Sequence, residues 1–320
     1  MKKLLTCLTL LMCLVLVAFE EPKSDAVTLR WKLETGQLLR YRSELIQTQK
    51  TGDTLVTTRV GVVLRQVVRG ISKDGVVSMD LTHDAIRMSV DGPAPVNYDS
   101  TRKGGDAKFN DLESTKVLAP LLDVRASMTM DPTGKIIELK GMSEAMEKVE
   151  SSLETDSQRR IAEGIKHLFQ DDALRQILEY NVFPAKSIAV DSTWSRKVEI
   201  EGSFGTMTVE YDYALTRVEK RGGIRVADIA LKAKTTVEKD KKTAPVGVSI
   251  HTTAAELAGS MSFAIDSGRM TRLVADSSLT MRVTMPGPPA KDLETEIEFE
   301  SEATMHQVIA LLGEGDPAFE

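Results

Sequence analysis

The sequence predicts a β-dominated α+β fold in which two duplicated, curved antiparallel sheets, each half-barrel-like, flank a helical insert. Three observations lead to this prediction. Apolar and polar residues alternate along most of the chain, which is typical of strands with one buried face. Helical spacing replaces this alternation over residues 143–180. The alternating regions before and after that segment resemble each other in order and spacing.

The N-terminus has the pattern of a secretory signal peptide over residues 1–18. Two lysines precede an apolar run from Leu4 to Ala18, and two glutamates follow it closely. The run is shorter than the ~20 apolar residues of a membrane-spanning helix. Lipidation at Cys13 is the alternative, but Met12 is larger than the small residue that normally precedes a lipidated cysteine. We therefore expect an exported protein, periplasmic or extracellular, without a transmembrane anchor.

Composition narrows the function classes. Both cysteines, Cys7 and Cys13, lie within residues 1–18, so the rest of the chain is cysteine-free, which excludes disulfides, thiol nucleophiles and cysteine metal sites there. The net charge of −6 becomes −8 when the two lysines of that segment are removed, leaving 39 basic against 47 acidic residues. A mildly acidic chain without a basic block is not expected to bind nucleic acid.

The first β region extends over residues 27–140. Alternation separated by turn residues predicts strands at 27–33, 39–45, 56–68, 77–81 and 85–90. A hairpin then follows, in which Arg125–Met130 and Lys135–Leu139 flank the turn Asp131-Pro132-Thr133-Gly134.

Two segments are expected to be irregular. Residues 91–117 are polar and rich in turn formers, which predicts a long exposed loop with little regular structure. Such a loop is functional or disordered, and the sequence leaves both alternatives open. Asp99 and Ser100 beside it are candidate polar site residues or ordinary turn formers. The acidic tail at 313–320 is expected to be flexible.

Residues 141–183 form the predicted helical connector. Apolar residues such as Met146 and Val149 recur there at helical spacing, and Pro184 ends the segment. The pair Asp171-Asp172 is placed to cap a second helix, and a general acid and base pair is the alternative.

The second β region covers residues 184–312 and returns to the period of two. Its hairpin from Ser260 to Leu273 matches the hairpin from Ser127 to Leu139, and Asp191–Ile200 matches Gly36–Leu45. We interpret these matches as an internal duplication. The alternative is that any two amphipathic hairpins look alike.

Several short motifs accompany this pattern: Leu29-Arg30-Trp31-Lys32, Gly36, Arg40-Tyr41, Tyr98-Asp99-Ser100, Leu121 and Asp131-Pro132-Thr133-Gly134-Lys135. With these residues the chain resembles an uncharacterised exported bacterial family, defined as a domain of unknown function. The resemblance covers most of the chain after residue 18. It implies the compartment and the architecture, but it brings no assigned activity.

Catalytic signatures are not found in the sequence. It has no His-Glu-x-x-His zinc motif, no complete phosphate-binding loop at Gly134-Lys135, no Gly-x-Ser-x-Gly elbow and no EF-hand loop. The four histidines lie far apart, which favours ordinary surface or boundary residues over a metal site. We therefore expect a protein that is not an enzyme and that needs no cofactor or metal.

Three groups of side chains have two interpretations each. The first group is the aromatic residues of the strands, which either line a pocket or pack in the core and in cross-strand pairs. They are Trp31, Tyr41, Trp194, Tyr211 and Tyr213. Strand methionines suit a lipid cavity or fill an ordinary core: Met79, Met128, Met130, Met261, Met270 and Met281. Basic residues of the first strands form a polyanion or glycan site, or a solvated sheet face: Arg30, Lys32, Arg40 and Arg42.

Three function classes follow from these observations. The first is a binding or carrier module for an apolar envelope ligand, such as a lipid, and it predicts a large, enclosed apolar cavity between sheet and helices. The second is a structural or protein-interaction component of the envelope, which predicts a filled core and either an exposed apolar patch or an unprotected edge strand. The third is an enzyme of unrecognised class, which predicts polar groups in a cleft near residues 98–106. The sequence leaves the oligomeric state open.

The signal peptide is directly testable. When the full chain is expressed in a bacterium, we expect purified protein that starts at about residue 19, because the apolar run ends with a small residue at Ala18. Intact-mass spectrometry measures the start of the chain. The variant Ala18→Trp is the control and is expected to slow or shift cleavage. A purified protein that retains residues 1–18 would contradict the prediction.

Overall fold

The computed structural model describes residues 26–93, 95–102, 110–166, 171–179, 182–202, 205–238, 249–286 and 296–319. The expected signal peptide at residues 1–18 lies outside these ranges. The predicted class is confirmed, because the described part is a β-dominated α+β fold with one large antiparallel sheet and a few helices.

The sheet has twelve strands, and eleven of them follow one another in the order β6-β5-β3-β2-β1-β12-β11-β10-β9-β8-β7, while β4 pairs with β3 beside this path. Their bounds are β1 Leu38–Thr51, β2 Thr54–Ile71, β3 Val77–Asp91, β4 Val96–Asp99, β5 Arg125–Met130, β6 Ile136–Lys140, β7 Thr193–Gly202, β8 Gly205–Arg221, β9 Ile224–Glu238, β10 Ser249–Ala264, β11 Arg269–Pro286 and β12 Glu296–Leu311.

The helical segments are short. They are α2 Leu112–Leu118, the 3-10 helix η1 Ala119–Asp123, α3 Met142–Ser151, α4 Asp156–Lys166 and α5 Asp171–Leu178. No helix among the described residues is long and apolar enough to cross a membrane.

The two β regions form one sheet rather than the two separate sheets that we expected. Strand β1 pairs with β12 over eleven residue pairs, from Tyr41 opposite Leu311 to Thr51 opposite Ser301. This pairing satisfies backbone donors and acceptors on edges that two separate sheets would leave open. The local alternation of residues carries no information about such a distant partner, so sequence reasoning missed it.

The loop expected at residues 91–117 contains two regular elements, which corrects that expectation. Strand β4 pairs with β3, with Tyr98 opposite Met88. Helix α2 begins after Asp111, whose carboxylate accepts hydrogen bonds from the backbone N–H of Ser114 at 2.7 Å and from its hydroxyl at 2.7 Å. This side-chain cap satisfies a free donor at the helix start. Residues 103–109 lie outside the described part.

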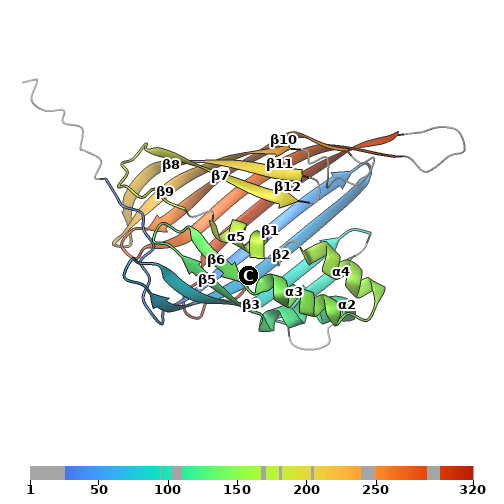
Figure 1. Ribbon diagram of the computed structural model, residues 1–320, viewed down its shortest axis with the longest axis horizontal. Coiled ribbons are helices and arrows are strands. Elements are labelled where there is room, and N and C mark those ends of the chain that lie inside the picture. The colour runs from blue at the N-terminus through green and yellow to red at the C-terminus, as the bar shows by residue number, and fades with distance from the viewer. Residues whose placement is uncertain are drawn as a thin grey trace, which may run out of the picture.

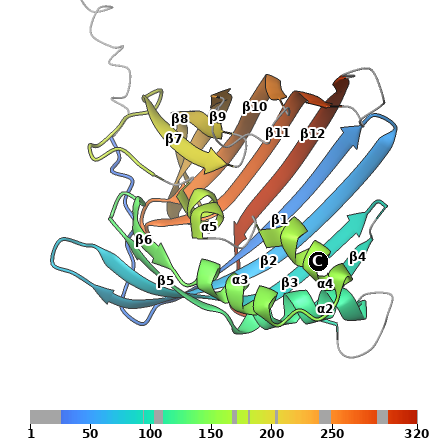
Figure 2. The same cartoon turned by 45° about the vertical axis from the view of Figure 1, so that its right-hand side comes forward.

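The sheet is strongly curved, and the helices lie on its concave side (Figures 1 and 2). Helices and sheet bury a continuous apolar core between them, which includes Leu118 and Leu121 from the helical side and Met79, Leu81 and Ile136 from the strands. We call the helix-facing side the inner face and the opposite side the outer face.

The two edge strands, β6 and β7, are linked through Glu179, which directly follows α5. Its carboxylate accepts a hydrogen bond from the backbone N–H of Ile136 in β6 at 3.2 Å. It also forms an ion pair with the guanidinium of Arg196 in β7, which donates a second bond to the Glu179 carbonyl at 2.6 Å. The side chain of Glu179 is only 8% exposed. This buried acid therefore ties together the ends of the sheet path.

Matched backbone features support the proposed duplication. Gly36 and Asp191, which the sequence alignment pairs, both have positive φ, and Asp191 is the one non-glycine residue in the described chain that does. The N–H of Gly36 donates to the Val68 carbonyl at 2.8 Å, and the N–H of Asp191 donates to the Leu215 carbonyl at 2.8 Å. A register irregularity follows Val68 and another follows Leu215.

The hairpins that the alignment pairs share a further irregularity. The register shifts between Thr129 and Met130 in β5, and between Ser262 and Phe263 in β10, which are equivalent positions in the alignment. Such bulges are retained features rather than random defects. The duplication stays a proposal, which these positions support.

The C-terminal tail lies on the outer face. The Phe319 ring packs on Gly61, where a Cβ atom would lie 2.7 Å from the ring. The guanidinium of Arg87 lies over the same ring, 4.5 Å from its centroid, in a cation–π contact. The tail that the sequence predicts to be flexible therefore has a docking place on β2 and β3.

Two glycines with almost the same φ allow the cost of backbone strain to be measured separately from the cost of steric overlap. Gly268 and Gly222 have φ of 59° and 58°. A Cβ at Gly268 would lie 2.6 Å from the Arg30 carbonyl oxygen and against the Lys32 nitrogen, whereas nothing lies within 4 Å at Gly222. We expect Gly222→Ala to lower the free energy of unfolding by about 1–2 kcal/mol through backbone strain alone. Gly268→Ala should cost roughly 1–3 kcal/mol more through overpacking.

Urea denaturation of both variants beside the wild type measures these differences. Equal losses for the two alanine variants would show that the contact of the Gly268 turn with residues 30–32 is absent in solution.

Buried His83 makes stability depend on pH. Burial lowers the pKa of its imidazole below the ordinary 6.5, and its Nδ1–H donates to the Leu121 carbonyl at 3.1 Å. Below pH 6.5 the unfolded chain binds a proton at this residue and the folded chain does not, so stability falls as the pH drops from about 7.5 to 5.5. We expect His83→Gln to reduce this slope, as measured by urea midpoints across that range.

The matched control is Gln66→Ala, because Gln66 is buried but cannot ionise. This variant should retain the wild-type slope. If His83→Gln and the wild type lose stability in parallel, His83 does not stay neutral in the folded state.

Candidate functional site

The pairing register shows which side chains share the inner face. Successive side chains of a strand point to opposite faces, so directly paired residues lie in rows across the sheet. One inner row crosses six strands from β10 to β3, and it consists of Leu257, Ser277, Met305, Gln47, Thr58 and Val90. The adjacent row crosses five strands from β10 to β2, and it consists of Ala255, Leu279, Ala303, Gln49 and Val56.

These eleven residues form what we call the uncovered inner face. All of them are half-buried, in contrast to the fully buried core residues farther along the same strands, such as Leu273 and Ile86. None of the eleven is ionisable. Leu257 and Val90 pack against the core, so the uncovered inner face continues the core surface.

The outer face of the same strands has the opposite character. Charged side chains stand there at the alternate positions, namely Lys50, Arg59, Asp91, Glu256, Asp276, Arg282, Glu300 and Glu302. A sheet with both faces in water would carry charge on both. The two faces of these strands therefore differ in charge, as is usual for a sheet with one face turned toward the core.

A seam of neutral polar residues runs along the centre of the uncovered inner face, where β1 meets β12. The Gln49 side-chain amide donates to the Ser301 hydroxyl at 3.2 Å, and the Thr51 and Ser301 hydroxyls lie 3.0 Å apart. Gln47 stands between Met305 and Thr58, and its amide makes no hydrogen bond within the described residues. Within the uncovered inner face, the Gln47 amide and the Gln49 side-chain oxygen are thus available for further hydrogen bonds.

Apolar side chains flank the seam on both sides. Leu257 and Leu279 lie toward β10 and β11, whereas Val56 and Val90 lie toward β2 and β3. The result is a surface with apolar ends and a neutral polar middle. Chemically it can hold an extended apolar molecule and supply hydrogen bonds near the middle of it.

A pocket of about 660 Å³ lies on the outer face, at the end of strand β4 where Asp99 lies. Charged and polar side chains, which include Glu44, Arg59, Arg87 and His306, line it together with apolar side chains such as Ile46. Arg87 donates to Glu44 at 2.8 Å, Arg59 pairs with Asp91 at 2.5 Å, and His306 pairs with Asp276 at 2.7 Å. Ion pairs therefore occupy the Glu44, Arg59 and Arg87 side chains, and the pocket has a mixed lining of paired charges and apolar side chains.

The candidates Asp99 and Ser100 form a turn. Asp99 accepts hydrogen bonds from the Thr101 backbone N–H at 2.9 Å and from its hydroxyl at 2.6 Å. The Ser100 hydroxyl accepts from the Ile86 N–H at 2.9 Å. Asp99 also lines the outer pocket, but its partners are local, as the turn interpretation predicts.

Of the pair Asp171-Asp172, the Asp172 side chain is not among the described side chains, and Asp171 binds the start of a helix other than the one that we expected. Its carboxylate accepts from the Met142 N–H at the start of α3, at 2.9 Å, and its own N–H donates to the Ser143 hydroxyl at 3.2 Å. It therefore joins the starts of α3 and α5.

The basic residues of the first strands bind protein groups. Arg30 donates to the carbonyls of Leu29 and Pro184 at 2.9 and 2.7 Å, and Lys32 donates to the Ile265 carbonyl at 3.0 Å. Arg40 and Arg42 form ion pairs with Asp84 at 3.0 Å and Glu44 at 3.4 Å. These contacts favour a structural role over a polyanion site.

The strand aromatics pack in the core rather than around a pocket. Trp194 stacks on Tyr213 with ring centroids 5.2 Å apart, and Trp31 meets Phe263 edge-on at 5.9 Å. Tyr41 is buried and donates to the Met270 carbonyl at 3.0 Å, and burial raises its pKa. The methionines follow the same pattern, since Met79, Met128, Met130, Met261 and Met270 are buried, whereas Met281 is half-buried on the inner face.

Within the described residues, no group of three or more His, Cys, Asp and Glu side chains is placed to hold a metal ion. His83 is buried and His306 is exposed, so the structure does not bring these two together. His167 lies outside the described part, and the His251 side chain is not among the described side chains.

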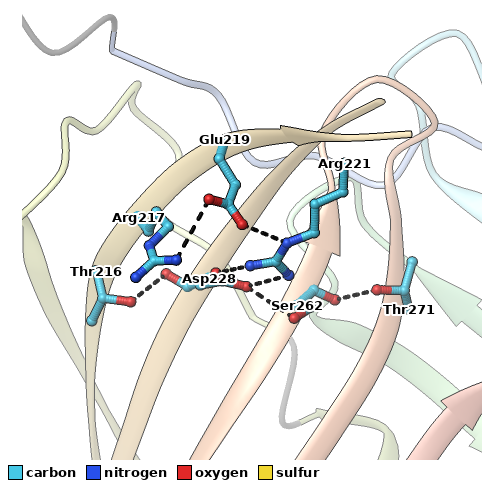
Figure 3. A network of polar contacts seen from close by, with 7 residues as sticks. All are labelled: Thr216, Arg217, Glu219, Arg221, Asp228, Ser262 and Thr271. Atoms are coloured by element: carbon cyan, nitrogen blue, oxygen red, sulfur yellow. Dashed lines mark hydrogen bonds and ion pairs between the residues drawn. The ribbon is translucent and has the colours of Figure 1, made fainter. Parts of the chain in front are cut away.

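A polar network on the outer face clamps strands β8 to β11 (Figure 3). Arg221 donates to Glu219 at 2.6 Å and to Asp228 at 3.0 Å, and these bonds, that to Asp228 foremost, raise the pKa of its guanidinium. Ser262 donates to Asp228 at 3.0 Å, and Thr271 donates to the Ser262 carbonyl at 3.1 Å. Each group is paired, so the network fits a clamp better than a binding site.

A family model covers residues 74–271, which is more than half of the chain. It describes a family of unknown function, DUF6263. The chain belongs to this family. The match confirms the resemblance to an uncharacterised domain, and it includes the motifs at Tyr98–Ser100 and Asp131–Lys135 but not those at Leu29–Tyr41. No curated protein matches the chain.

Solved structures resemble the DUF6263 chain in part. A lipovitellin structure on lipid–protein interactions shows 9% identity and a TM-score of 0.45 over 88% of this chain. The chain spans 26% of the lipovitellin chain. An outer membrane channel from Pseudomonas putida F1 shows 9% identity and a TM-score of 0.20, over 88% of this chain and 97% of that one. A DUF1329 family protein from Desulfovibrio piger shows 11% identity and a TM-score of 0.17, over 86% and 84% of the chains.

Sequence reasoning missed the residues of the uncovered inner face. One signal was present in β1, where the inner-facing series Leu39, Tyr41 and Leu45 continues as Gln47 and Gln49. At these positions of β1 the inner-facing residues change from apolar to neutral polar, while the partner strand β2 still carries Val56 opposite Gln49. Such a change indicates where the inner face is no longer fully buried.

Proposed function

We propose that this DUF6263 protein is an exported carrier that binds an apolar envelope molecule, such as a lipid, on the uncovered inner face. The observation that carries the proposal is the contrast between faces. Eleven contiguous inner residues are uncharged and half-buried, while outer positions of the same strands are charged.

The physical basis is the hydrophobic effect. Apolar surface gains about 25 cal/mol for each Å² that is removed from water, so a concave sheet face with leucine and valine side chains favours an apolar occupant. The expected signal peptide places such a protein in the envelope, where lipids are the abundant apolar molecules. Nothing in this proposal requires catalysis.

A structural or protein-interaction role is the second candidate. Among the described residues, β7 pairs with β8 alone, so its other edge is open to a strand from a partner. The Lys197–Glu199 pair on this strand places charge along that edge, which opposes indiscriminate pairing.

The first experiment is native mass spectrometry of the full chain, expressed in a bacterium and processed by the cell. Organic extraction and lipid analysis of the same sample then identify the adduct. We expect a stoichiometric apolar adduct. A bare mass that stays unchanged after incubation with envelope lipids would contradict the carrier proposal and favour the protein-interaction candidate.

A pair of identical substitutions on opposite faces tests the site itself. Leu279→Ser removes apolar surface from the uncovered inner face, whereas Leu55→Ser removes it from the outer face of β2, where Leu55 is 59% exposed. We expect Leu279→Ser to weaken lipid binding about tenfold, equivalent to about 1.4 kcal/mol, and Leu55→Ser to leave it unchanged.

Binding is measured by displacement of a fluorescent fatty ester, and circular dichroism confirms that both variants are folded. Equal affinities of the two variants would show that the ligand does not lie on the uncovered inner face.

A further inference from the structure

We infer that the ligand of the uncovered inner face is a nonionic amphiphile: an apolar molecule whose polar groups are esters, amides or hydroxyls rather than a carboxylate or phosphate. The inference rests on the proposed function and names the class of molecule that the same face accepts. It follows from two features of that face, its lack of charge and its central seam of glutamine, serine and threonine.

The lack of charge argues against an ionised ligand group. Moving an ion into a poorly hydrated place costs several kcal/mol unless an opposite charge compensates it. The two inner rows offer no lysine, arginine or histidine for this purpose. The basic side chains of the same strands, such as Lys50, Arg59 and Arg282, point to the outer face. A carboxylate lying on the seam would therefore stay unpaired.

The residues of the seam favour a ligand whose polar groups are neutral. Gln47 has both a donor and an acceptor, and within the described residues neither is bonded. Gln49 uses one amide donor on Ser301, so its carbonyl oxygen is still able to accept. A pure hydrocarbon over these groups would leave them without partners, which costs about 1–3 kcal/mol for each buried group. An ester or hydroxyl satisfies them.

The position of the seam specifies where the polar group lies in the ligand. Strand spacing in a sheet is about 4.8 Å, so the row from β10 to β3 spans roughly 24 Å. Gln47 lies on β1, the fourth strand of this row, with Met305 and Ser277 on one side and Thr58 and Val90 on the other. The polar group is therefore expected within the molecule, with apolar parts on both sides.

Four probes that share an eighteen-carbon chain test this class in one titration series: monoolein, methyl oleate, sodium oleate at pH 9 and 1-octadecene. Binding to the full chain is followed by displacement of a fluorescent fatty ester, at concentrations below aggregation. We expect monoolein and methyl oleate to bind at least tenfold more tightly than oleate, and monoolein to bind more tightly than octadecene.

A variant pair on adjacent residues of β1 locates the effect. Gln47→Lys places a cation in the seam and is expected to reverse the preference, so that oleate binds more tightly than methyl oleate. Thr48→Lys places the same cation on the outer face and should retain the wild-type order, because Thr48 alternates with Gln47. Gln47→Leu should give octadecene and monoolein equal binding affinities, and the variant should stay folded.

The outcomes separate this inference from the proposed function. Oleate binding as tightly as its methyl ester, or octadecene as tightly as monoolein in the wild type, would overturn the nonionic class and leave the carrier proposal intact. Failure of all four probes to bind would overturn the carrier proposal as well. A reversal of preference by Thr48→Lys would show that the ligand contacts the outer face.

Discussion

The shape of the molecule depends on the buried carboxylate of Glu179. An antiparallel sheet of this width has two open edges, and here one acid binds a backbone donor of β6 and the guanidinium of β7. A buried charge is stable when all of its partners are in place, so the contacts of Glu179 fix how far the two edges can separate. These contacts thus hold together the two ends of a curved sheet whose concave side is the inner face (Figure 1).

Local patterns in the sequence were sufficient to predict the strands and the helical connector. The period of two identified most strands, and the change to helical spacing identified α3, α4 and α5. Contacts between distant residues were not predictable. The pairing of β1 with β12 joins positions 250 to 270 residues apart, from Thr51 opposite Ser301 to Tyr41 opposite Leu311, and nothing local encodes it. Asp171 similarly caps α3, 29 residues before it, rather than its own helix.

The candidate site was hidden for a related reason. Alternation tells which residues share a face, but it does not tell where the helices stop covering that face. Gln47 and Gln49 occupy core-facing positions yet are polar, a conflict between pattern and residue type that often marks a functional region. The outer pocket shows the converse. Its charged residues attract attention in a sequence, but their ion pairs explain them as parts of the scaffold.

The pairing of β1 with β12 also determines when the protein can fold. The first long strand to be synthesised lies in the middle of the sheet, and its second neighbour is the last strand to be synthesised. Contacts between residues so distant in the chain form slowly, and half of the central ladder is missing until residues 296–311 are present. In the growing chain, the edge of β1 that faces β12 therefore lacks its partner until almost all residues have been synthesised. A chain that ends before residue 296 would expose this edge of β1 at the centre of the sheet, where it could pair with a strand of another molecule.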